Sequence, residues 1–237
     1  MFNKFKILSL IPARRYSSAL KNKNQKKLNG LKLFEIAILA SKKSKYIDDT
    51  YVSSDAKDIL LSSKKLGVKT IKRSKKYSSS KADVNLVISD FLKKVSKLIN
   101  KQKTVFVYLQ PTSPFRNHKH IDAALNKFFK SKSNILVSVK KYDQKIFKSL
   151  TQKKNKLTSI VDPKYITKNR QSLPKVFTPN GAIYIFKTKY FSKNKKLIIN
   201  NSSFYIMNEK ESIDIDDQLH FNKAKKLSKK YLIYKSK

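Results

Sequence analysis

Two aspartates near the C-terminal end of the chain have the spacing of a metal site. Asp214 and Asp216 are two residues apart in the segment Ser-Ile-Asp-Ile-Asp-Asp. Side chains two apart in an extended segment point to the same side, and two hard carboxylates there suit Mg²⁺ that bridges substrate phosphates. The chain has only 15 Asp and Glu, so this cluster stands out. The alternative is a helix N-cap in which Asp216 and Asp217 stabilise a terminal helix, and both interpretations can hold together.

Arginine is rare among the 55 basic residues of the chain. The abundance of Lys, Asn and Ile resembles drift towards AT-rich codons, which replaces a tolerant arginine by lysine. An arginine that persists against such drift needs its planar fork, which matches phosphate or carboxylate. The alternative is chance survival. The five arginines are Arg14, Arg15, Arg73, Arg116 and Arg170.

A polar loop follows the first apolar run of the chain. It contains Arg14, Ser17, Ser18, Lys23 and Asn24. Backbone amides, hydroxyls and basic groups in such a loop could cradle a polyphosphate. An ordinary solvated loop is the alternative, because the segment has no glycine before position 30.

A second polar loop, Gln-Pro-Thr-Ser-Pro-Phe-Arg at 110–116, follows the fourth expected strand. Its two prolines fix the backbone, so the polar side chains between them lose little entropy on binding. The alternative is a rigid turn into the next helix. We favour a binding role, since rigid loops on a scaffold often carry sites.

Alternating strands and helices are expected to position these loops. Apolar runs predict strands at 5–11, 51–53, 68–71, 104–109, 135–139, 182–186 and 204–207. Helical spacing predicts helices at 31–44, 56–66, 82–99, 120–129 and 217–234, the second capped by Asp55 and closed by Gly67. This order implies βαβ units, an α/β fold and a mostly parallel sheet, with ligands beyond the carboxyl ends of the strands. We expect one domain over residues 1–237, with an arm at about 140–179, where the pattern breaks.

Composition excludes several classes of protein. The absence of cysteine excludes disulfides and thiolate metal sites and fits a cytoplasmic protein. No apolar run reaches the ~18–20 residues of a membrane span, and no secretion signal is evident. The formal charge of +40 is spread along the chain, whereas nucleic-acid modules concentrate charge on one face. The three histidines, at 118, 120 and 220, form no metal pattern, and we expect them to be solvated surface residues.

Sequence pieces along the whole chain resemble those of the cytidylyltransferases that activate acylneuraminates and related nonulosonic acids. They are Ile-Pro-Ala-Arg at 11–14, Lys-Asn at 23–24, Leu-Asn-Gly at 28–30, Val-Ser-Ser-Asp at 52–55, Arg73, the whole of 110–116, Arg-Gln at 170–171, Pro-Asn-Gly-Ala-Ile-Tyr-Ile at 179–185 and Ser-Ile-Asp-Ile-Asp at 212–216.

The resemblance implies a Rossmann-like nucleotidyltransferase fold with a small dimerisation arm, and a homodimer. It implies that CTP contacts Arg14, Ser17, Lys23, Asn24 and Arg73, with Arg14 and Lys23 also stabilising charge during catalysis. It places the sugar acid against Gln110 and Asn180 of one subunit and against Lys148 and Arg170 of the other. Asp214 and Asp216 would hold Mg²⁺.

We therefore expect an enzyme that couples CTP to a nine-carbon 2-keto sugar acid and releases pyrophosphate, with no specific nucleic-acid or membrane partner. One alternative is a cytidylyltransferase for another sugar acid, such as an eight-carbon one. The other is a catalytically weakened, basic binding protein for RNA or anionic surfaces. The second rests on the first loop, where the family usually reads Arg-Gly-Gly-Ser-Lys-Gly and residues 14–19 here read Arg-Arg-Tyr-Ser-Ser-Ala. Intact Gln110, Asn180 and the acid pair argue against it.

Overall fold

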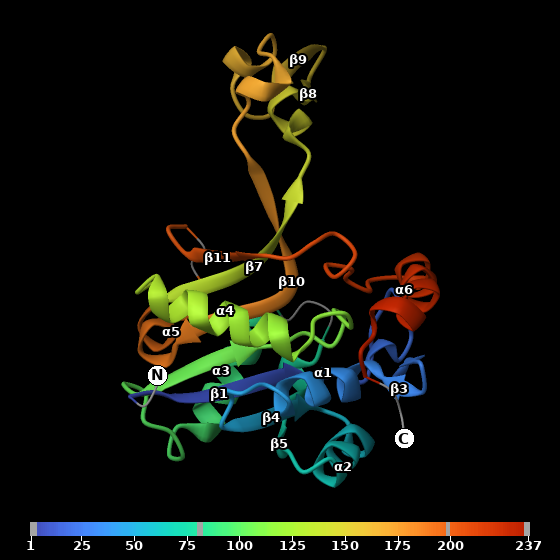
Figure 1. Cartoon of the computed structure of the whole chain (residues 1–237), viewed down its shortest axis with the longest axis vertical. Coiled ribbons are helices and arrows are strands. Elements are labelled where there is room, and N and C mark those ends of the chain that lie inside the picture. Colours follow the sequence, from blue (N-terminus) through green and yellow to red (C-terminus); the bar gives the residue numbers. More distant parts are fainter. Residues whose placement is uncertain (1–3, 80–82, 198–199, 235–237) are drawn as a thin grey trace.

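Seven strands form the central sheet of the computed structural model, which describes residues 4–79, 83–197 and 200–234 (Figure 1). The strands of the sheet are β1 (Lys6–Pro12), β4 (Asp49–Ser54), β5 (Lys69–Lys72), β6 (Thr104–Tyr108), β7 (Ile135–Tyr142), β10 (Val176–Lys187) and β11 (Ser203–Ile206). Their order is β11-β7-β10-β6-β1-β4-β5. Only β10 runs antiparallel to its neighbours. The predicted α/β fold with a mostly parallel, mixed sheet is confirmed.

Helices cover both faces of the sheet (Figure 1). They are α1 (Leu33–Lys42), α2 (Lys57–Lys65), α3 (Val84–Val95), α4 (His118–Lys130), α5 (Thr188–Asn194) and α6 (Gln218–Tyr231). Strand residues alternate between the two faces. In β6, Val105 and Val107 join the core under α1 and α4, whereas Phe106 and Tyr108 join the core under α3 and α5. Apolar side chains on both faces explain the near-continuous apolar runs of the central strands.

Several local expectations need correction. The side chain of Asp55 does not cap α2, because its carboxylate accepts a hydrogen bond from the backbone N–H of Arg15. Helix α1 starts later than expected, since residues 31–32 form β3 (Leu31–Lys32), which pairs with β2 (Lys27–Leu28). The expected first residue of α3, Ala82, lies outside the described residues, and that helix ends at Val95. Helix α5 was not predicted.

Two of the three histidines are also not the solvated residues we expected. His120 is largely buried, with Nε2 3.4 Å from a carboxylate oxygen of Glu211. His118 lies 3.0 Å from the hydroxyl of Tyr234 through Nδ1. Only His220 has half of its side chain exposed. These contacts tie the start of α4 to the segment before the acid pair and to the C-terminal part of the chain.

An arm projects from the sheet where β7 and β10 continue as a twisted ribbon (Figure 1). Beyond the ribbon lie the hairpin of β8 (Leu150–Lys153) and β9 (Lys156–Ser159) and three short 3-10 helices at Gln144–Lys148, Pro163–Tyr165 and Arg170–Ser172. The rings of Phe147 and Tyr165 are 4.7 Å apart and form a small internal contact. Other apolar side chains of the arm stay exposed, among them Leu157, Ile160 and Val161.

None of the helices in the described ranges has the length and apolar composition that crossing a bilayer requires.

Candidate active site

The loops beyond the carboxyl ends of β1, β5 and β6 meet the acid pair around one cavity of about 240 Å³. These strands are parallel and lie near one another in the sheet, so their ends open to the same edge. Seven predicted site residues line the cavity: Arg14, Lys23, Asn24, Arg73, Gln110, Asp214 and Asp216. The resemblance therefore identified a set of residues that the fold brings together from distant parts of the chain.

The acid pair sits at one end of this cavity. Ile215 is fully buried and its N–H donates to the carbonyl of Thr112 at 2.9 Å, so the aspartates on either side of it are presented to the cavity. Burial raises the pKa of Asp214, and the charge of Asp216 acts in the same direction, against the Thr112 hydroxyl and the ammonium of Lys23. Asp214 is therefore held where a nearby cation would stabilise its charged form.

The donor set fits a divalent cation that also binds substrate. Asp214 Oδ1 is buried and has no hydrogen-bond partner among the described residues. Within the same ranges, no group of three or more His, Cys, Asp and Glu could hold a metal on its own. Two carboxylates suit Mg²⁺, which usually binds proteins through one or two carboxylates and takes further oxygens from water and phosphates. Lys23 donates to Asp216 at 3.2 Å and adds a positive charge beside the pair.

The first loop is held in place by polar side chains instead of by glycine geometry. Asn24 donates its amide N–H to the carbonyl of Arg14 at 2.8 Å. Arg15 donates through its backbone to Asp55 at 3.0 Å and through its guanidinium to Asp58 at 2.5 Å. The side chain of Arg15 is thus turned away to α2, and Arg14 is left to line the cavity. These anchors hold Arg15 in place at a position where the family usually has glycine.

Arg73 and Tyr108 are two buried residues that also line the cavity. Arg73 is 4% exposed and donates to the carbonyl of Ser53 at 2.7 Å. Burial lowers the pKa of Arg73, and burial raises the pKa of the Tyr108 phenol. Arg73 belongs to the wall of the cavity and has little surface to offer a ligand.

Four further residues of the cavity lining come from the part of the chain at 75–95, which includes α3, and were not predicted: Tyr77, Asp83, Val84 and Val87. The side chain of Asp83 accepts a hydrogen bond from the N–H of Leu86 and caps α3. An aspartate before an apolar helical run is a signal that sequence reasoning could have used.

Strand β10 passes directly beneath the acid pair. A Cβ atom at Gly181 would lie 2.8 Å from Oε1 of Gln110 and 3.0 Å from Oδ2 of Asp214. Gly181 also has a φ of +73°, which disfavours any other residue. Only glycine therefore lets the strand approach both side chains.

Asn180 does not face the cavity as predicted. It is 4% exposed, and its Oδ1 accepts from the hydroxyl of Ser138 at 2.6 Å while its Nδ2 donates to Ser212 at 2.9 Å. Its amide thus links β7 to the start of the acid segment. A buried polar group is best satisfied by such internal partners, and Asn180 acts as a positioning residue.

The remaining predicted residues lie away from the cavity lining. Ser17 belongs to the first loop but does not line the cavity. Lys148 and Arg170 belong to two of the short helices of the arm, and Arg170 is exposed. Within one subunit these two basic residues do not complete the site.

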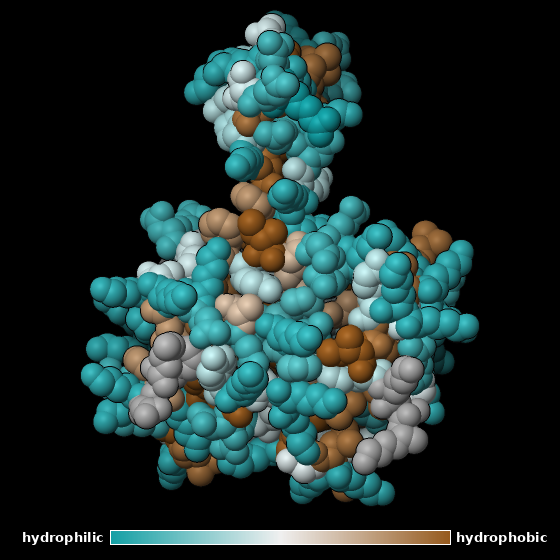
Figure 2. Space-filling model, in the orientation of Figure 1, coloured by the Kyte–Doolittle hydropathy of each residue, from teal (hydrophilic) through white to brown (hydrophobic). Residues whose placement is uncertain are grey.

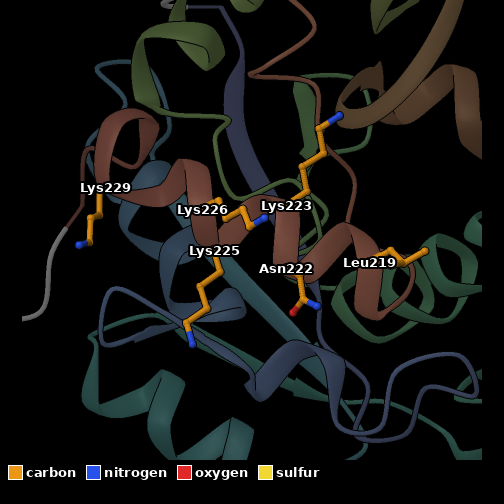
Figure 3. A pocket seen from close by; sticks show the side chains of 6 residues that line it. All are labelled: Leu219, Asn222, Lys223, Lys225, Lys226 and Lys229. Carbon is orange, nitrogen blue, oxygen red and sulfur yellow. The ribbon is translucent and has the colours of Figure 1, made fainter.

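A hollow of about 840 Å³ along α6 offers no comparable chemistry. Its lining is Leu219, Asn222 and four lysines, and Figure 3 shows Lys223 and Lys225 pointing in opposite directions. The ammonium groups do not converge on one point, and no acid or nucleophile joins them. We take this surface as a solvated lysine face.

Comparison with known proteins decides the family. The profile of the cytidylyltransferase family ("Cytidylyltransferase") matches residues 8–237. The chain belongs to this family. The predicted enzyme class, a nucleotidyltransferase, is thereby confirmed.

Two relatives are similar to this cytidylyltransferase in sequence, and one solved structure is similar to it in fold. The N-acylneuraminate cytidylyltransferase of Escherichia coli O18:K1:H7 (strain RS218 / NMEC) is 30% identical over 92% of this chain, which spans 51% of that relative, about half its length. The CMP-N,N'-diacetyllegionaminic acid synthase of Campylobacter jejuni subsp. jejuni serotype O:2 is 27% identical over 91% of this chain and 92% of its own length. A CMP:2-keto-3-deoxy-manno-octonic acid synthetase, solved with CTP, has a TM-score of 0.70 at 12% identity and covers 94% of this chain and 98% of its own.

Proposed function

We propose that the protein is a Mg²⁺-dependent cytidylyltransferase that transfers CMP from CTP to a nonulosonic acid, a nine-carbon 2-keto sugar acid, and releases pyrophosphate. One observation carries the proposal: the acid pair and the basic first loop line the same cavity, with Lys23 3.2 Å from Asp216 and with Arg14 and Asp214 also in the lining. The names of the two relatives, which act on acylneuraminate and diacetyllegionaminic acid, support the nine-carbon substrate.

The reaction is a displacement at the α-phosphorus of CTP. The anomeric hydroxyl of the sugar acid releases its proton to solvent and forms the new P–O bond, and the bond between the α-phosphorus and pyrophosphate breaks. Asp214 and Asp216 would hold Mg²⁺, which when bound would neutralise charge on the phosphates and the leaving group. Arg14 and Lys23 stabilise the charge that grows on the pyrophosphate side. The chemistry then depends on positioning and electrostatics.

The sugar acid is bound between two subunits in this proposal. Gln110 lines the cavity from its own subunit, and Lys148 and Arg170 would come from the arm of a second copy, each next to the sugar carboxylate. The exposed apolar side chains of the arm support a homodimer, because Leu157 is 71% and Ile160 54% exposed in the single chain. Packing against a second copy would remove this apolar area from water. We treat residues 1–237 as one catalytic domain with this arm and place the reaction in the cytoplasm, where CTP is made.

Turnover with a substrate panel tests the function. The purified protein is incubated with CTP, Mg²⁺ and, in turn, N-acetylneuraminic, legionaminic, pseudaminic and eight-carbon 2-keto acids, and pyrophosphate and the CMP-sugar are both measured. We expect turnover with a nine-carbon acid and at least about tenfold lower kcat/KM with the eight-carbon acid, since lost or misplaced polar contacts weaken transition-state binding. Preference for the eight-carbon acid would change the substrate class. No turnover with any acid would overturn the proposal.

A further inference from the structure

The guanidinium of Arg116 is buried without an acidic partner. Arg116 is 0% exposed, and its Nε and Nη1 have no hydrogen-bond partner among the described residues. Burial lowers its pKa to about 10, with the Tyr234 phenol opposing the shift, so the group is still charged at neutral pH. A buried, unpaired charge opposes folding. Stability of the fold therefore gives no reason for an arginine at this position.

The contact that Arg116 does make is to the start of its own loop. Its Nη2 donates to the carbonyl of Gln110 at 3.3 Å. Its backbone N–H donates to the carbonyl of Ser113, also at 3.3 Å. The guanidinium thus joins the last residue of the loop to the first, across two prolines that already restrict the backbone.

This loop supplies one wall of the cavity. The side chains of Gln110 and Thr112 line it. The carbonyl of Thr112 also accepts the N–H of Ile215, the residue between the two aspartates. A shift of this loop would therefore move Gln110 and disturb the hydrogen bond that positions the acid pair. The first loop, with Arg14 and Lys23, is a separate segment.

We propose that Arg116 is a positioning residue: its buried guanidinium fixes the Gln110–Thr112 segment against the sugar-acid end of the cavity, at a cost to the stability of the fold. This inference rests on the proposed function. It also accounts for arginine at this position in a chain that otherwise uses lysine, because a lysine ammonium has no planar fork to fill the same place.

The test compares Arg116→Met and Arg116→Lys with Phe115→Leu as the matched control. Phe115 is the preceding residue and is also buried, but it packs against Tyr231 and lines no part of the cavity. Each variant is assayed for the KM of sugar acid and CTP, for kcat, and for the midpoint of thermal unfolding.

We expect Arg116→Met to change the KM for the sugar acid without loss of stability, and Phe115→Leu to lower stability without a change in KM. Arg116→Met should raise the KM for the sugar acid about tenfold or more and leave that for CTP within about threefold, because the loop is misplaced by a fraction of an ångström or more. The midpoint of thermal unfolding of Arg116→Met should be unchanged or a few degrees higher, because the variant removes a buried charge. Arg116→Lys should not restore the sugar-acid KM. Phe115→Leu should lower the midpoint by about 2–5 °C with both KM values unchanged.

The outcomes separate the two claims. A wild-type protein that turns over no acid in the panel overturns the proposed function. An active wild type with an unchanged sugar-acid KM in Arg116→Met overturns the inference alone. A clearly lower midpoint for Arg116→Met overturns it whatever the activity, since the guanidinium would then be a stabilising group.

Discussion

At the scale of single residues, three neighbouring aspartates have three different surroundings. Asp214 lines the cavity and is partly buried, Asp216 pairs with Lys23, and Asp217 caps α6 by accepting the N–H of His220 at 2.8 Å. The N-cap interpretation of the sequence therefore applies to Asp217, and Asp214 and Asp216 stay the proposed metal ligands. A substitution of Asp217 can therefore serve as the control for substitutions of Asp214 and Asp216.

Removal of either proposed metal ligand should abolish turnover. We expect Asp214→Asn and Asp216→Asn to lower kcat by about 100-fold or more, because each loses a hard anionic ligand for Mg²⁺ held with substrate phosphates. Asp217→Asn should keep activity, since asparagine caps a helix about as well as aspartate. Pyrophosphate release over a Mg²⁺ series measures this. Near-normal rates in both ligand variants would remove the proposed role.

The buried carboxyl should also affect stability in a pH-dependent way. The pKa of Asp214 is raised above 3.8 in the folded protein, so its folded form binds a proton more tightly than its unfolded form. Stability from this group is present below the unfolded pKa and is lost as pH rises through the folded pKa. Without ligands, Asp214→Asn should therefore unfold at a higher temperature than wild type at pH 7, and this advantage should shrink towards pH 4. A lower midpoint at pH 7 would contradict the burial argument.

At the scale of elements, the backbone of β10 passes very close to two side chains of the candidate site. We expect Gly181→Ala to reduce both stability and kcat, because a Cβ would contact Gln110 and Asp214. Gly67→Ala is the matched control. Gly67 has the same φ of +73°, but its added Cβ would meet only the end of the flexible Lys42 side chain, at 3.3 Å. Both variants should lose stability, by about 1 kcal/mol for the backbone alone, and only Gly181→Ala should lose activity. Equal activity in the two would show that the close approach is unimportant.

The sequence predicted the elements whose signal is local. The central parallel strands β1, β4 and β6 were found because both of their faces are buried, and Gly67 was correctly placed after α2 because that position needs positive φ. Asp55 was misassigned since its partner, Arg15, is forty residues away in sequence. The same holds for Asn180, whose partners Ser138 and Ser212 come from two other segments. Contacts of this kind become visible only in the fold.

For the candidate site, too, local sequence signals were found and contacts formed only in the fold were missed. The family pieces identified most of the cavity lining, because each piece can be matched without knowing its neighbours. Tyr77, Asp83 and Val87 were missed, since their part of the chain matched no family piece. Arg116 had been grouped with possible anion ligands, and only its burial shows that no external ligand reaches it.

At the scale of the whole molecule, complementation between two inactive chains tests the proposed dimer. Arg170→Ala should remove a contact to the site of the second copy, and Asp214→Asn one within its own. In a one-to-one mixture, half of the dimers are mixed and each has one intact site of two, so about a quarter of wild-type activity should return. Rates are measured after co-refolding, with each variant alone as the control. A fully active monomer, or no recovery on mixing, would contradict the arrangement.

The charge of +40 is distributed over the molecule. Figure 2 shows hydrophilic residues over most of the visible face, on the arm as on the sheet domain. We expect RNA binding to be weak, indifferent to sequence and lost by about 200 mM salt, since it depends on counterion release alone. Titrations with several RNA sequences at 50 and 200 mM salt measure this, with CTP turnover as the parallel readout. Tight, selective binding at the higher salt by a protein without turnover would favour a binding protein.

The continuity of β10 has a practical consequence for anyone who redesigns this enzyme. That strand has twelve residues. It begins in the arm and passes directly behind the candidate active site at Asn180 and Gly181. The arm is thus not a module that can be excised at a linker. A minimal, armless variant would have to be spliced where Pro179 pairs with Val139, so that a new hairpin turn replaces the arm and the strand beyond it keeps its register.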